Sequence, residues 1–103
     1  MIIKSEAFEN NGNIPSKFTC DREGINPELI FSNVPKETKS LVLLMDDPDA
    51  PMGTWDHWVI FNMPPDTKGI GENSTPAGIV GKNTRGNNLY GPPCPPDREH
   101  RYF

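Results

Sequence analysis

Two histidines and two aspartates of this chain stand beside rigid turns, and their side chains suit the binding of a small anion. Asp47 and Asp49 belong to the turn Asp46-Asp47-Pro48-Asp49-Ala50-Pro51, which leads to His57. His100 follows the stretch Gly91-Pro92-Pro93-Cys94-Pro95-Pro96. A carboxylate bonded to one imidazole nitrogen raises the pKa of the ring and leaves the other nitrogen to donate outward. The pattern predicts a polar pocket in which two imidazoles hold an anionic oxygen.

Further groups near these residues would complete such a pocket. Tyr102 could supply a hydroxyl, and the proline-rich stretch could donate a backbone N–H only from Gly91 or Cys94, because proline has none. The protein is predicted to bind its ligand without catalysing a reaction, and to need neither metal nor cofactor. The predicted ligand-binding residues are Asp47, Asp49, His57, Gly91, His100 and Tyr102.

Other interpretations of the same residues stay open. Asp-Pro sequences often only cap turns, and the histidines could be ordinary strand residues. The two aspartates and two histidines could bind a metal, although His57 and His100 are far apart in the sequence for metal ligands. Cys94 could serve as the nucleophile of a hydrolase. The loops could also act as an interaction module that inhibits a kinase or a protease.

The elements that must position these residues read mostly as strands. Leu41–Met45 is a continuous apolar run, which is typical of a strand buried on both faces. The segments His57–Met63 and Leu29–Phe31 are rich in β-branched, aromatic or other apolar residues. Met1–Phe8 and Lys17–Cys20 are predicted to pair around the Asn11-Gly12 turn. A further short strand is expected at 78–81, and the class is mainly β, a sandwich with long loops.

The last four residues, His100–Phe103, begin what reads as another strand. A core strand of that length leaves unpaired edges, so we expect either a domain truncated at its C-terminus or completion by another chain. Self-association into a homo-oligomer is the corresponding expectation.

Length and composition narrow the class of protein. The 103 residues are enough for one domain, and the net charge of −4 argues against nucleic acid as a partner. No stretch is long and apolar enough to cross a bilayer, and the acidic start does not resemble a signal peptide, so a cytoplasmic protein is expected. Cys20 and Cys94 are best interpreted as two separate thiols, with a bridge between them as the alternative.

The motifs together resemble the phosphatidylethanolamine-binding protein family, in its bacterial and archaeal branch that is described as Raf-kinase-inhibitor-like. The resemblance rests on Asp47–Pro51 with His57-Trp58, on the loop before His100-Arg101-Tyr102, and on Ile14-Pro15 with Phe18–Asp21. It covers nearly the whole chain and implies one domain over residues 1–103 that lacks its C-terminal part.

The resemblance also implies a fold and a site. The fold would be a Greek-key antiparallel β-sandwich with a small anion pocket. That pocket would be lined by Asp47, His57, His100 and Tyr102, with Asp49 and the loop 91–96 at its wall. Family members bind phosphate-bearing headgroups or other small anions, and several regulate kinases or inhibit proteases.

Overall fold

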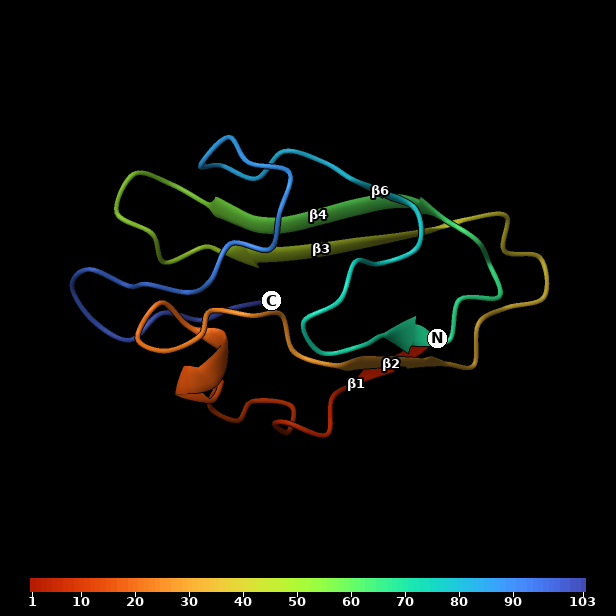
Figure 1. The fold of residues 1–103 in the computed structure, drawn as a ribbon, viewed down its shortest axis with the longest axis horizontal. Coiled ribbons are helices and arrows are strands. Elements are labelled where there is room, and N and C mark those ends of the chain that lie inside the picture. Colours follow the sequence, from red (N-terminus) through yellow and green to blue (C-terminus); the bar gives the residue numbers. More distant parts are fainter.

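The chain folds into two antiparallel sheets of three strands each, in a computed structural model that describes all residues from 1 to 103. One sheet has the order β1 (Ile2–Lys4), β2 (Leu29–Ser32) and β5 (Gly69–Ile70). The other has the order β3 (Leu41–Asp47), β4 (Trp55–Met63) and β6 (Ile79–Val80). Figure 1 shows the two sheets as separate layers. The predicted mainly β sandwich is confirmed, and three connections cross between its sheets, as Greek-key chains do.

The core lies between the two sheets and draws on both of them. Phe31 and Ile70 come from the first sheet, and the second contributes Trp58, Ile60 and Met63. These side chains are nearly inaccessible, Ile60 being 0% and Met63 1% exposed. Only 14 of the 103 residues are buried, so this core supplies modest stabilisation and the loops need other restraints.

Strand β3 forms as predicted but is not buried on both faces. Val42 is 61% and Leu44 is 60% exposed, whereas Leu41 is buried. The reason is that only one face of β3 lies over the core, so its side chains alternate between core and solvent. Self-association stays a prediction, and the exposed apolar face of β3 is the surface that we expect to mediate it.

The predicted pairing around Asn11-Gly12 is wrong. Strand β1 pairs with β2 instead, with Ile3 opposite Phe31. Asn11 and Gly12 do form a turn, in which the Gly12 amide donates to the Glu9 carbonyl at 2.8 Å. After that turn the chain does not return as a strand, because Ser16–Phe18 forms a 3₁₀ turn behind Pro15.

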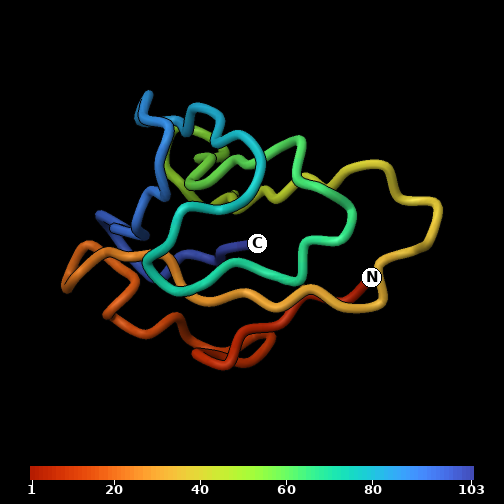
Figure 2. The backbone as a smooth tube through the Cα atoms, turned by 45° about the vertical axis from the view of Figure 1, so that its right-hand side comes forward, coloured from red at the N-terminus to blue at the C-terminus, as the bar shows by residue number.

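Strands β2, β4 and β6 confirm the other predicted strands, while β5 was not predicted. The final residues form no assigned strand, but Phe103 exchanges two backbone hydrogen bonds with Asp46, at 2.8 and 2.9 Å. This pairing holds the C-terminal end against the free edge of β3. Figures 1 and 2 both place that end between the two layers.

No helix of the fold is long and apolar enough to cross a membrane.

Candidate functional site

A small pocket at one end of the sandwich gathers four of the six predicted site residues, which are Asp47, His57, His100 and Tyr102. Its volume is about 190 Å³. That is below the roughly 300–1,000 Å³ of pockets for drug-sized ligands and suits a compact group of few atoms. The remaining wall is formed by Ala50, Pro51, Trp55, Arg85, Pro92, Cys94, Pro95 and Pro96.

A β-bulge in strand β4 aims His57 into this pocket. Met45 of β3 lies opposite Trp58, and the next residue, Asp46, lies opposite Asp56, so His57 has no partner across the ladder. An extra residue of this kind breaks the alternation of side chains. His57 and Trp58 are therefore both buried although they are adjacent in the sequence. Trp58 packs in the core while His57 lines the pocket.

Gly91 holds the His57 ring through the backbone and does not line the pocket. The His57 Nδ1–H donates to the Gly91 carbonyl at 2.8 Å, and the Gly91 amide donates to the His57 carbonyl at 2.8 Å. A Cβ at position 91 would lie 3.0 Å from the His57 carbonyl oxygen, so the close approach requires glycine. Burial lowers the pKa of His57, and the neutral ring then presents the lone pair of Nε2.

His100 lies between two carboxylates, each bonded to one of its ring nitrogens. Nδ1 is 2.6 Å from Asp47 Oδ2, and Nε2 is 2.7 Å from Asp97 Oδ1. The bond to Asp47, followed by the one to Asp97, raises the pKa of His100 despite burial of the ring. Because both nitrogens must carry a proton to make these bonds, His100 is an imidazolium. The expected bond between a carboxylate and an imidazole nitrogen is thus the one between Asp47 and His100.

Tyr102 brings an unpaired hydroxyl into the same pocket. Its oxygen is buried and makes no hydrogen bond to the protein. The ring meets His57 edge to face, with centroids 5.3 Å apart. Burial, reinforced by the negative charges of Asp47 and Asp49, raises the pKa of Tyr102 to about 12. The hydroxyl therefore keeps its proton near neutral pH and is available as a donor.

Asp49 supports the site from outside the pocket lining. Both of its carboxylate oxygens are taken by the Arg101 guanidinium, at 2.9 and 2.8 Å, and Oδ2 also accepts from the Arg101 amide at 2.8 Å. This bidentate pair holds the pKa of Asp49 well below its usual range. Asp49 therefore ties the turn after β3 to the segment that carries His100 and Tyr102, and both of its oxygens are engaged by Arg101.

The proline-rich loop is fastened by a disulfide between Cys20 and Cys94, whose Cα atoms are 5.4 Å apart. The preferred interpretation of two separate thiols is thus wrong, and the bridge left open in the sequence is present. The Cys20 amide also donates to the Pro93 carbonyl at 3.1 Å. With Cys94 in a disulfide, it has no thiolate to act as the nucleophile of a hydrolase.

Two charged residues near the pocket were not predicted. Asp97 bonds to His100, and its position directly after the proline-rich loop, three residues before that histidine, was the signal that could have revealed it. Arg85 lines the pocket from the loop after β6, and its charge contributes to lowering the pKa of His57. No local pattern marks Arg85, because it reaches the site only through the fold.

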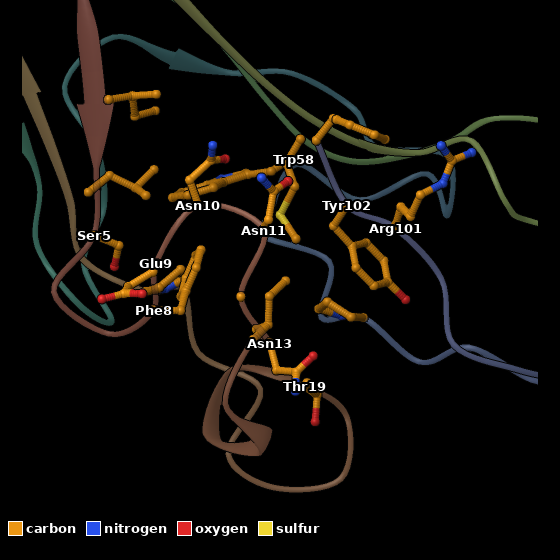
Figure 3. Close-up of a pocket in the computed structure, with 18 of the residues that line it drawn as sticks. Ser5, Phe8, Glu9, Asn10, Asn11, Asn13, Thr19, Trp58, Arg101 and Tyr102 are labelled. Atoms are coloured by element: carbon orange, nitrogen blue, oxygen red, sulfur yellow. The ribbon is translucent and has the colours of Figure 1, made fainter.

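A larger groove of about 1220 Å³ runs between the N-terminal segment and β3. Figure 3 shows this groove, with Phe8 and Glu9 toward one end and Arg101 and Tyr102 toward the other. The groove is larger than the small pocket. However, of the two histidines only His100 lines the groove, and Asp47 does not line it. We therefore place the candidate site in the small pocket, which shares Pro95, His100 and Tyr102 with the groove.

The charge of His100 should make stability depend on pH. Because the folded-state pKa lies above the ordinary 6.5, the imidazolium stabilises the fold fully below that pH and loses this effect as pH rises through the raised pKa. We expect the stability difference between wild type and His100→Gln, measured by denaturant unfolding, to be larger at about pH 5.5 than at about pH 9. The lowered pKa of His57 changes stability with pH in the opposite direction, but this effect is the same in wild type and His100→Gln and cancels when the two proteins are compared. A stability difference between the two proteins that grows with pH would contradict the positive charge assigned to His100.

The fold and the pocket define a β-sandwich with a small His/Asp site, and comparison with known proteins gives its family. The model of the phosphatidylethanolamine-binding protein family matches residues 4–103, so the chain belongs to that family. It is 50% identical over 109 residues to a UPF0098 protein of Methanothermobacter thermautotrophicus, covering 100% of this chain and 72% of that protein.

Two solved structures are also similar to this chain. The crystal structure of a putative phosphatidylethanolamine-binding protein homolog from Chlamydia trachomatis has a TM-score of 0.93 at 44% identity, over 97% of this chain and 69% of that one. E. coli YbcL, a member of the same family, has a TM-score of 0.88 at 28% identity, over 97% of this chain and 71% of that one. All three of these relatives are longer than the present chain.

Proposed function

We propose that the pocket binds a small phosphate-type anion and catalyses no reaction on it. The observation that carries this proposal is the buried Tyr102 hydroxyl, which has no hydrogen-bond partner, in a residue that lines the pocket together with both histidines. An unsatisfied buried polar group costs about 1–3 kcal/mol. A ligand oxygen that accepts from this hydroxyl would remove this cost, which favours binding of a ligand in the pocket.

The charges around the pocket support an anion. His100 is a buried imidazolium, and Arg85 adds a second positive charge at the wall. Tyr102 supplies an O–H donor, and Gly91 keeps the His57 ring in place beside it. These groups offer a ligand one hydroxyl, one unprotonated nitrogen and two nearby cations. A phosphate group, with several oxygens around one centre, can meet them simultaneously.

The family name supplies a chemical class of ligand. Phosphatidylethanolamine carries a phosphate in its headgroup, and the pocket volume of about 190 Å³ suits a headgroup better than an acyl chain. The state of two side chains supports binding without catalysis. Cys94 lies in a disulfide, and both nitrogens of His100 are engaged, so these two residues cannot act as the nucleophile and base of a hydrolase.

Removal of the Tyr102 hydroxyl tests the proposal. We expect Tyr102→Phe to bind inorganic phosphate and phosphoethanolamine about tenfold more weakly than wild type, because one hydrogen bond to a charged ligand is lost. Affinity would be measured by calorimetry or NMR titration. Tyr90→Phe is the matched control, since the Tyr90 hydroxyl already donates to the Phe18 carbonyl at 2.9 Å and Tyr90 does not line the pocket. Equal affinities in all three proteins would refute the assignment.

A further inference from the structure

Neither histidine of the pocket has a free N–H to offer to an anion. Both ring nitrogens of His100 are bonded, Nδ1 to Asp47 at 2.6 Å and Nε2 to Asp97 at 2.7 Å. The neutral ring of His57 has one N–H, at Nδ1, and it is bonded to the Gly91 carbonyl at 2.8 Å. The expectation that both imidazoles donate to the ligand therefore requires a change of protonation at one of the two rings.

The backbone fixes which nitrogen of His57 is protonated. His57 and Gly91 exchange two hydrogen bonds, because the Gly91 amide donates to the His57 carbonyl at 2.8 Å while the ring donates to the Gly91 carbonyl. A carbonyl oxygen can only accept, so the proton of the neutral ring stays at Nδ1. Nε2 is left for the pocket, which His57 lines, and makes no hydrogen bond to the protein. Any further proton must therefore bind at Nε2.

A fully ionised oxyanion beside His57 would face the lone pair of Nε2. Protonation of Nε2 replaces this repulsion with a hydrogen bond between opposite charges, which is about twice as strong as a neutral one. The other donors of the pocket cannot change state in the same way near neutral pH. Tyr102, whose pKa is raised to about 12, already holds its proton, and the Arg85 guanidinium is always charged. His100 already carries a proton on each ring nitrogen.

The titratable groups around His57 come from every element packed against it: Asp47 of β3, Asp56 of β4, Arg85 of the loop after β6, and His100 and Tyr102 of the C-terminal segment. Burial lowers the pKa of His57, and the charge of Arg85 acts in the same direction. The bond to Gly91 and the charges of Asp47 and Asp56 oppose this effect without overcoming it. A bound anion would add a negative charge at the nitrogen that is still without a proton.

We infer that the pocket takes up a proton at His57 Nε2 when it binds a fully ionised oxyanion, which couples anion affinity to pH through this one ring. The inference rests on the proposed anion-binding function. By thermodynamic reciprocity, the proton and the anion each raise the affinity for the other by the same factor. Affinity is therefore highest where the ring is protonated before binding, and it falls as pH rises toward the higher pKa that His57 has in the complex.

Sulfate is the sharpest probe of this coupling, because its charge is constant near neutral pH and every proton taken up on binding must go to the protein. We expect sulfate affinity to fall about tenfold from about pH 6 to about pH 8. Calorimetry in two buffers of different ionisation enthalpy should show about half a proton or more taken up per sulfate at about pH 7.

His57→Gln should lose this proton uptake, and its sulfate affinity should change by less than about threefold over the same pH range. Tyr90→Phe is the control, because it removes a titratable group that does not line the pocket, and it should behave as wild type does. NMR of the ring nitrogens of wild type should show that His57 Nε2 becomes protonated when sulfate is added. This last measurement decides the question even if His57→Gln does not fold.

The outcomes separate this inference from the function on which it rests. Proton uptake that persists in folded His57→Gln, or a His57 Nε2 that stays unprotonated at saturating sulfate, would overturn the inference. So would binding of phosphate without binding of sulfate, since the ligand would then supply the proton. Binding of neither anion at any pH in this range would overturn the proposed function itself. Thermal unfolding at each pH shows that the compared proteins are folded.

Discussion

Replacement of both Cys20 and Cys94 by serine should lower the free energy of unfolding by about 4.5 kcal/mol, the chain-entropy value for a bridge between residues 74 positions apart. The effect is large because domains are stable by only about 5–15 kcal/mol and this one buries 14 of its 103 residues. The disulfide joins the 3₁₀ region to the proline-rich loop, which has no regular strand of its own. Without it, these two segments would be held by few backbone hydrogen bonds.

Denaturant unfolding measures this loss, and reduction of the wild-type protein supplies the control. A reducing agent should destabilise wild type by a similar amount and leave the double serine variant unchanged. The variant should also bind phosphate more weakly, because the loop that carries Gly91 positions His57. A loss of stability below about 1 kcal/mol would show that the loop is held mainly by its other contacts.

The second large effect is expected from His100→Gln, which should weaken phosphate binding by about 30- to 100-fold. The variant removes the buried positive charge of the pocket. It also leaves the carboxylate of Asp47, a residue that is only 3% exposed, without its cationic partner. A loss of about 30- to 100-fold corresponds to about 2–2.7 kcal/mol. The loss is electrostatic, since both ring nitrogens of His100 are already bonded to Asp47 and Asp97.

His57→Gln is the comparison for that prediction, since it alters the other imidazole without removing a positive charge. Its loss of affinity, measured in the same titrations, should be clearly smaller than that of His100→Gln. An affinity of His100→Gln within about twofold of wild type would contradict the electrostatic account of the site.

The strands of this fold could largely be predicted because hydrophobic runs and proline stops mark them. The segment His57–Met63 ends before Pro64 in the sequence as in the structure, whereas β3 runs past Met45 to Asp47. The burial of β3 could not be predicted, since an apolar run does not say how many faces are covered. The Asn11-Gly12 turn does not lead to a strand pair, because a local reversal of the chain does not require that two strands flank it.

Four of the six predicted residues line the pocket, but their bonding could not be predicted. The convergence of His57 and His100 rested on motifs 43 positions apart, and the structure brings both to one pocket. The partner of each nitrogen depends on contacts such as that between Asp47 and His100, which are 53 positions apart. Asp49 was predicted to bind the ligand because it is acidic and lies in the same turn as Asp47. In the structure its carboxylate pairs with Arg101.

The most direct test follows the ring nitrogens of both histidines by NMR while inorganic phosphate is added. Before addition, His100 should show two protonated nitrogens and His57 one, at Nδ1. Saturating phosphate should shift the His57 Nε2 signal strongly, perturb that of His100 Nε2, and leave His100 Nδ1 little changed beside Asp47. Signals from both rings that stay in place throughout the titration would contradict the binding of an anion between them.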